Sequence, residues 1–234
     1  MSPGTPRQGS GRGTDGWRSG RTFSWPVRLL MVPVVIVITL LGLWVTAGQI
    51  TSDFALSMVL SGVWFGLAGL AALLTAIHWR PLALPVLGTF VVTAGVVTAV
   101  LFSATFTDNT VDEQIAVAGG PGGNTELASG EFVGQAHEAT GTAAVIEFAD
   151  GNQALTFSEL ETDNGPDLRV YMVDGTVDDG SINGDFVDLG GLKGNVGDQQ
   201  YEIPADVDPS TYSTVSIWCR AFSASFAMAD LQIS

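Results

Sequence analysis

The sequence predicts a membrane protein of two unlike halves: three transmembrane helices, followed by an all-β domain with an antiparallel β-sandwich or barrel-like fold. Three long runs without a charged residue occupy positions 29–48, 54–78 and 82–106. From residue 129 onward, short segments of alternating apolar and polar residues are separated by turn-forming residues. A run of about 20 apolar residues crosses a bilayer as a helix, whereas alternation with a period of two is typical of half-buried strands.

Charge divides the chain at nearly the same point. Residues 1–103 contain six basic and two acidic residues, a net charge of +4. Residues 104–234 contain 22 acidic and three basic residues, a net charge of −19. A surface this acidic repels nucleic acid and anionic lipid headgroups. The second half is therefore not a nucleic-acid-binding module, and its charge fits a solvated surface.

The first half is expected to be a membrane anchor within residues 27–106. The joints between its apolar runs are short, so consecutive helices should be antiparallel neighbours. None of the three runs contains an acidic or basic residue in its interior. An ion or proton pathway needs such residues within the membrane. We therefore expect these helices to anchor the protein and not to transport a solute.

The orientation of the anchor follows from its arginines. Residues 1–26, which are rich in Gly, Ser, Pro and Arg, are expected to form a disordered cytoplasmic tail. Arg80 lies in the second joint, whereas the first joint and the segment after residue 106 contain no basic residue. By the positive-inside rule, the N-terminus and the second joint face the cytoplasm. The sequence thus predicts a multi-pass protein of the cell membrane, with its C-terminal domain outside the cytoplasm.

A polar segment at 107–128 joins the two halves. It is acidic, it has no basic residue, and it contains the glycine-rich stretch 119–123. Glycine-rich sequences of this kind form flexible chains. We expect a flexible acidic linker here, followed by the extracytoplasmic domain at 129–234.

Two segments of the outer domain show the strand alternation most clearly. In the first, Leu168, Val170 and Met172 alternate with Arg169, Tyr171 and Val173; in the second, Val215, Ile217 and Cys219 alternate with Ser216, Trp218 and Arg220. Alternate residues of a strand point to opposite faces. Cys219 should therefore face the core together with Val215 and Ile217, and Trp218 should lie on the other face.

Separated motifs in the outer domain resemble the DM-thirteen domain. They run, in chain order, Gly134-x-x-His137, Gly165-Pro166-Asp167-Leu168-x-Val170-Tyr171, Leu192-Lys193-Gly194-Asn195-x-Gly197-x-Gln199-x-Tyr201 and Ile217-Trp218-Cys219-Arg220. The resemblance covers about 129–233 and leaves out the membrane half. It implies electron transfer, with the cysteine as redox group. In animals the domain is found beside DOMON domains.

Cys219 is the only cysteine, so the chain has no intrachain disulfide. As a functional residue it would be a redox group that forms an adduct or binds a cofactor. As a structural residue it would be a small buried side chain, whose thiol has a raised pKa and is inert. Trp218 is the second redox candidate; its alternative is to cap the domain, with Arg220 across its ring.

His137 is the only histidine of the outer domain and a possible ligand; together with Met172 or Met228 it could ligate haem. A blue-copper site needs two histidines and a cysteine, which this domain does not contain. Covalent haem attachment is excluded by the lack of a CxxCH motif. No metal site is predicted, and the sequence does not identify a cofactor. A lone histidine is more often a hydrogen-bonded structural residue than a ligand.

The remaining residues of the resemblance are expected to be structural. They are Gly165, Pro166, Asp167, Lys193, Gly194 and Tyr201. Asp167 follows a Gly-Pro turn and should bind turn amides. Lys193 is one of three basic residues in the outer domain, and we expect it to pair with Asp167.

No catalytic residues are predicted, since the chain has no Ser-His-Asp arrangement and no phosphate loop. A classical enzyme is therefore not expected, and two functions stay open. One is a membrane-tethered electron-transfer module centred on Cys219, which would need a redox partner protein. The other is a non-catalytic acidic domain that binds a partner or the envelope. In both, the lipid bilayer is a partner through the three helices; the sequence leaves the oligomeric state open.

Overall fold

A computed structural model describes residues 23–120 and 122–234 of the chain. Its first half consists of the helices α1 (Trp25–Gly48), α2 (Phe54–His78) and α3 (Thr89–Phe106). Short 3₁₀ and π turns at Arg80–Leu82 and Leu84–Gly88 lead into α3, so the third apolar helical stretch runs from Arg80 to Phe106. All three stretches are long and apolar enough to cross a membrane, as the sequence predicts.

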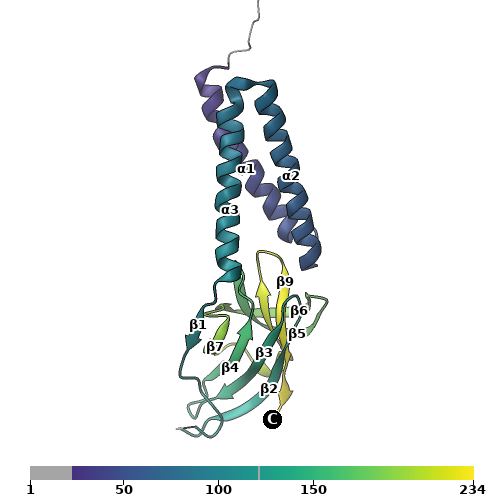
Figure 1. The fold of residues 1–234 in the computed structure, drawn as a ribbon. Coiled ribbons are helices and arrows are strands. Elements are labelled where there is room, and N and C mark those ends of the chain that lie inside the picture. The colour runs from purple at the N-terminus through teal and green to yellow at the C-terminus, as the bar shows by residue number, and fades with distance from the viewer. Residues whose placement is uncertain (1–22, 121) are drawn as a thin grey trace, which may run out of the picture.

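The three helices stand side by side above the β domain (Figure 1). The start of α1 and the turn from α2 to α3 lie together at the end remote from this domain, where the rings of Phe23 and Trp79 meet edge to face. Within the bundle, Trp64 packs against Gly42, where a side chain would collide with its indole. Trp64 also donates its ring N–H to the carbonyl of Thr39. The predicted tail at residues 1–26 lies almost wholly outside the described residues.

The second half is all β, which confirms the predicted fold class. Its longer strands are β2 (Thr125–Gly134), β3 (Ala139–Glu147), β4 (Gln153–Thr162), β5 (Leu168–Asp178), β6 (Ser181–Gly191), β7 (Val196–Ile203), β8 (Thr214–Cys219) and β9 (Ala224–Asp230). Two short strands, β1 (Thr110–Asp112) and β10 (Gln232–Ile233), pair with β7 and β2. The strand order is β1-β7-β4-β3-β2-β9-β8-β5-β6, and the sheet curls into a half-barrel.

Alternation along β5 and β8 separates two apolar clusters, as the sequence predicts. Val170, Met172, Val215, Ile217 and Cys219 lie in the main core inside the curled sheet. Residues of opposite parity form a smaller cluster on the other face, around Tyr171, Val173 and Val177, with Trp218 and Met228 packed against it. Burial of both faces explains the unbroken apolar run from Val170 to Val173 in β5.

The segment expected to be a flexible linker is partly fixed to the sheet. Residues Thr110–Asp112 pair in parallel with Val196–Asp198 of β7, and Glu113 continues the contact. Glycines make this approach possible, because a side chain at Gly194 or Gly197 would collide with the backbone of Asn109 or Val111. The domain boundaries drawn from the sequence remain predictions, but the linker is attached along this stretch.

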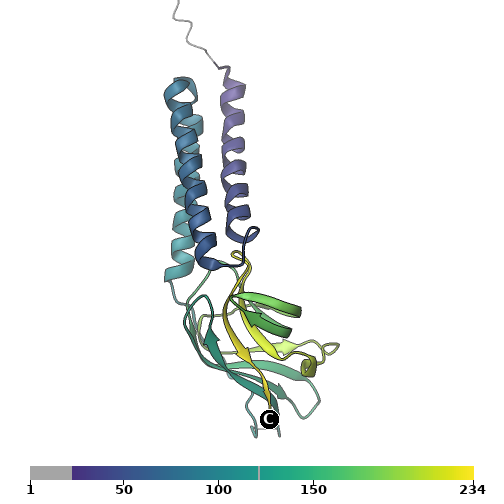
Figure 2. The ribbon, with the colours of Figure 1, turned by 90° about the vertical axis from the view of Figure 1, so that its right-hand side faces the viewer.

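The α1–α2 loop also touches the β domain. Phe54, at the start of α2, packs against the main core, with ring centroids 4.9 Å from His137, 5.1 Å from Phe222 and 5.9 Å from Phe226. Figure 2 shows this loop directly above the hairpin of β8 and β9. The β domain is therefore held at one end of the helices by two separate segments.

Candidate functional site

Cys219 ends β8 and is completely buried. It lies in the main core together with Ala47 of α1 and Phe222 of the following turn. Loss of solvent raises the pKa of its thiol from 9.0 to about 11, although nearby backbone N–H groups of Phe222, Asp167 and Ala221 act in the opposite direction. At neutral pH the thiol is therefore protonated, and a protonated, buried thiol is a poor nucleophile.

The turn after Cys219 faces the end of α1. Ser223 adopts a left-handed backbone conformation, with φ of 50°, and its hydroxyl donates to the carbonyl of Gly48 at 2.8 Å. A side chain at Gly48 would come within 2.9 Å of the carbonyl oxygen of Ala221. Non-glycine residues in this conformation are uncommon and carry strain. The strained turn and the glycine together let the hairpin and the helix end meet closely.

Trp218 lies on the opposite face of β8, where it belongs to an aromatic stack. The ring of Tyr171 is nearly parallel to that of Phe186, with an angle of 14° and centroids 4.4 Å apart. Trp218 continues the stack from Tyr171 at 6.2 Å and 22°. Tyr171 is buried and its pKa is raised chiefly by that burial, whereas Phe186 is about half exposed. The stack thus has its buried ring in the middle and a partly exposed ring at each end.

A cavity of about 530 Å³ separates this aromatic stack from the α1–α2 loop. Residues 48–52 form one wall, and Tyr171, Phe186 and Trp218 contribute to the other. The hydroxyls of Ser181 and Ser52 join the two walls by a hydrogen bond. The loop connects two of the helices that are long and apolar enough to cross a membrane.

His137 is held in place by its surroundings. Its Nδ1 lies 2.8 Å from a carboxylate oxygen of Asp163, and its ring packs between Phe54 and Phe226. Nε2 is buried and has no hydrogen-bond partner among the described residues. Within the same residues, no group of three or more His, Cys, Asp or Glu side chains is placed to hold a metal ion.

The expected ion pair between Asp167 and Lys193 is wrong. The Asp167 carboxylate accepts a hydrogen bond from Arg220 Nε at 2.7 Å, and the Arg220 amide donates to the Asp167 carbonyl. These bonds tie the Gly165-Pro166-Asp167 turn to the end of β8 next to Cys219. Arg220 is held by this pair, and no cation–π contact with Trp218 is found among the described residues.

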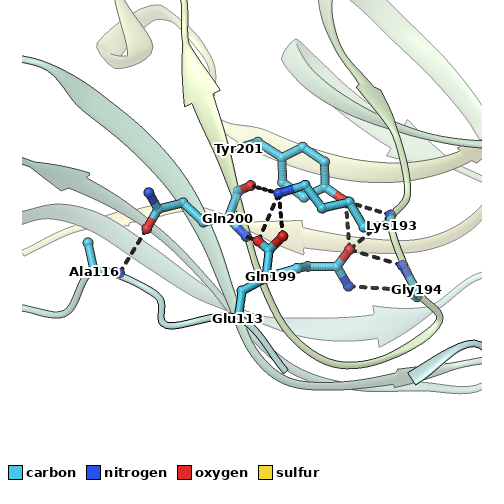
Figure 3. Close-up of polar contacts among 7 residues, drawn as sticks. All are labelled: Glu113, Ala116, Lys193, Gly194, Gln199, Gln200 and Tyr201. Atoms are coloured by element: carbon cyan, nitrogen blue, oxygen red, sulfur yellow. Dashed lines mark hydrogen bonds and ion pairs between the residues drawn. The ribbon is translucent and has the colours of Figure 1, made fainter. Parts of the chain in front are cut away.

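Lys193 is the centre of a polar cluster on the far side of the domain (Figure 3). Its ammonium group lies 2.8 Å from Glu113 and also donates to the carbonyl of Gln200 at 2.6 Å. The pair lowers the pKa of Glu113, with a further contribution from the backbone N–H of Gln200. Gln200 in turn accepts a bond from the amide of Ala116. The cluster therefore holds the segment that leaves α3 against β7.

Tyr201 and Gly194 complete this cluster from inside the domain. The Tyr201 hydroxyl donates to Gln199 Oε1 at 2.6 Å and accepts from the Lys193 amide at 3.0 Å. Burial raises the pKa of Tyr201, so the hydroxyl stays protonated as a donor. Gln199 Nε2 donates to the carbonyl of Gly194 at 2.8 Å. The geometry thus gives Lys193, Gly194 and Tyr201 a structural role.

Residues 131–231 match the model of a family described as "Electron transfer DM13". The β domain is a DM13 domain. The match begins within β2 and ends just after β9, so it includes Cys219 and the aromatic stack but not the helices or β1. No curated protein and no solved structure gives a significant match to the chain. The family description assigns electron transfer to this type of domain.

The DM13 domain contains functional candidates that sequence reasoning missed. Alternation in β5 and β8 predicts that Tyr171 and Trp218 lie on the face opposite the main core. It does not predict that Phe186 stacks on Tyr171, because Phe186 belongs to β6, where the alternation is weak. Phe54 belongs to an apolar membrane run, which conceals its contact with the β domain. Glu113 lies in the segment expected to be a flexible linker. Only its distance along the sequence from the glycine-rich stretch 119–123 could have indicated that this residue is ordered.

Proposed function

We propose that this protein is a membrane-anchored electron-transfer protein whose DM13 domain lies outside the cytoplasm, against the membrane surface. The observation that carries the proposal is the stack of Trp218, Tyr171 and Phe186, whose three rings line a cavity beside the α1–α2 loop. Aromatic rings at this position can bind and couple electronically to a redox group. The family description supports the same function.

The proposal assigns different roles to the two redox candidates. Trp218 is half-buried and lines the cavity, so it can contact a redox partner directly. Cys219 is fully buried and protonated at neutral pH, which favours a role as a core residue behind Trp218. Thiolate chemistry at Cys219 would require the turn 220–223 to open first.

Electron transfer is tested on the full-length protein in lipid nanodiscs. The rate at which the protein passes electrons from a soluble one-electron donor to a soluble one-electron acceptor is measured as electron uptake from the donor for wild type, Trp218→Phe and Cys219→Ser. We expect Trp218→Phe to lower the rate and Cys219→Ser to leave it nearly unchanged. Trp44→Phe is the matched control, since Trp44 is an exposed tryptophan of α1 outside the cavity. If only Cys219→Ser lost electron uptake, the redox group would be the thiol of Cys219. If wild type took up no electrons, the proposal would be overturned.

The location outside the cytoplasm rests on the arginine distribution and has its own test. In a Cys219→Ala background, Asp150→Cys introduces a thiol in an exposed turn between β3 and β4. A membrane-impermeant maleimide should label this thiol in intact cells, because positively charged segments are retained in the cytoplasm. Labelling only after cell lysis would place the domain on the cytoplasmic side.

A non-catalytic binding domain is the second candidate function. The burial of Cys219 favours it, as does the lack of a metal-binding group among the described residues. If this second function is correct, the domain takes up no electrons in the nanodisc assay. It binds a partner through its acidic surface instead. Electron uptake that depends on Trp218 would exclude it as the whole function.

A further inference from the structure

We propose that the cavity between the α1–α2 loop and the aromatic stack binds the ring of a lipid-soluble quinone. The choice of a quinone rests on the proposed electron-transfer function, whereas the site itself rests on geometry alone. A cavity of about 530 Å³ is large enough for such a ring and the start of its apolar tail.

The cavity differs in charge from the rest of the β domain. None of the described residues that line it is charged; they are Gly48, Gln49, Ile50, Thr51, Ser52, Tyr171, Ser181, Ile182, Gly184, Phe186, Trp218 and Ser223. The half of the chain that forms the β domain nevertheless carries 22 acidic residues. An anionic lipid headgroup or a phosphate would find no cation here, and a cation would find no carboxylate. The lining therefore selects an uncharged ligand.

The walls of the cavity combine flat aromatic rings with hydrogen-bonding groups. Phe186 is half exposed and nearly parallel to Tyr171 behind it, so its free face can stack on one further planar ring. Tyr171 has a hydroxyl without a hydrogen-bond partner among the described residues, and Gln49 contributes an exposed amide. These groups can donate hydrogen bonds to the carbonyl oxygens of a quinone. A purely hydrocarbon ligand would leave them unused.

The cavity lies beside the loop between two apolar helices. Residues 49–53 link α1 to α2, and Ile50 within this loop is exposed. A ligand dissolved in the bilayer can therefore enter sideways, with its ring in the cavity and its tail among the helices. The hydrogen bonds Ser223–Gly48 and Ser181–Ser52 hold the two walls together without filling the space between them.

The test uses the full-length protein in nanodiscs of phosphatidylcholine with a photoreactive azidoquinone. Cross-linked peptides are identified by mass spectrometry, with decylubiquinone as competitor. We expect label in residues 48–52 and 181–186, displaced by decylubiquinone. Phe186→Ala should weaken labelling about 2- to 10-fold, the range of one aromatic pair. Phe106→Ala is the matched control, since Phe106 is an exposed phenylalanine at the same membrane boundary but outside the cavity.

Three results separate the site from the proposed function. Label confined to the helices, or equal competition by a dimethoxybenzene with the same decyl tail, would overturn the quinone site. If electron uptake from a soluble donor persists in that case, the proposed function stands without it. Specific labelling in a protein that takes up no electrons would support the site and contradict the proposed function.

Discussion

Two segments attach the β domain to the helices, and they do so by opposite means. The segment after α3 is held by the polar cluster of Glu113, Lys193 and Gln200, together with a three-residue parallel pairing of β1 and β7. The α1–α2 loop is held mainly by Phe54, whose ring packs among His137, Phe222 and Phe226. One attachment depends on charge and backbone geometry, the other on apolar burial.

The difference indicates what each attachment controls. Hydrogen bonds and ion pairs are directional but contribute little net stability in contact with water. They fix where the chain from α3 runs along β7. Apolar packing is less directional and contributes more. Phe54 packs on Phe222, which lies three residues after Cys219 in the same core, so we expect this attachment to control access to the thiol.

The largest effect is expected from removing the apolar attachment. Phe54→Ala should destabilise the docked β domain by about 2 to 3 kcal/mol, somewhat less than for a fully buried phenylalanine. Hydrogen exchange in residues 219–226 and the rate of Cys219 alkylation should both rise. Leu56→Ala, at an exposed position of the same helix, serves as control. Unchanged alkylation in Phe54→Ala would mean that the loop does not protect the thiol.

Alkaline pH should weaken the same region through Cys219. The folded pKa of the thiol is raised from 9.0 to about 11, so the stability of the folded state is complete below pH 9 and falls as pH rises toward 11. The loss should reach about 2 kcal/mol, by the linkage relation. Urea unfolding at pH 8 and pH 10.5 measures it, with Cys219→Ala as the reference. Equal pH slopes for the two proteins would contradict the raised pKa.

Gly194→Ala should disrupt the polar attachment without changing any charge. The added methyl group would collide with the carbonyl of Asn109 and push β1 away from β7, at a cost of about 1 to 2 kcal/mol. Hydrogen exchange in residues 109–113 reports the loss. Gly191→Ala is the control, because its added methyl group would meet only one atom, at 3.9 Å. Similar exchange in both variants would show that the close approach at Gly194 is not needed.

Glu113→Gln should have a smaller effect on the same segment. It removes the charge pair with Lys193 and keeps the side-chain size, so we expect a loss of about 1 kcal/mol, typical of a hydrogen-bonded pair near the surface. Asp112→Asn is the control, since Asp112 is exposed and has no ion-pair partner among the described residues. High salt should reduce the difference between wild type and Glu113→Gln.

Acid should produce the smallest effect, in the direction opposite to that of Cys219. Lys193 holds the pKa of Glu113 below its usual 4.5, so the pair stabilises the segment above that pH. This stability disappears as pH falls through the lowered folded value. Hydrogen exchange in residues 109–116 between pH 6 and pH 3 should converge for wild type and Glu113→Gln. A difference that persists at pH 3 would show that the charge of Glu113 is not its source.

The sequence predicts most of the fold because its signals are local. Apolar runs of full membrane length define the helices, and alternation in β5 and β8 assigns Cys219 to the core and Trp218 to the other face, as the structure confirms. The alternation signal does not extend to β1. This strand has three residues and is ordered by β7, more than eighty residues later in the chain.

The candidate site is predicted less completely, because it depends on partners that are distant in sequence. The choice of Arg220 over Lys193 as partner of Asp167 depends on how β5 and β8 align. Phe186 reaches Tyr171 through the pairing of β5 with β6. The cavity needs residues from α1, β6 and β8 at once, and no single segment contains a pattern that indicates it.

The pairing of β1 with β7 also has a consequence for the order of events during synthesis. Residues 110–112 leave the ribosome early, but their partners at 196–198 follow only after β2 to β6 have been made. Contacts between residues so far apart in sequence form late. Strands β2 to β6 can therefore form while the segment after α3 is still unpaired. This segment becomes attached only when β7 has been made. Pairing of β1 with β7 then attaches the growing domain to the segment that leaves α3, and β8 and β9 follow later in the chain.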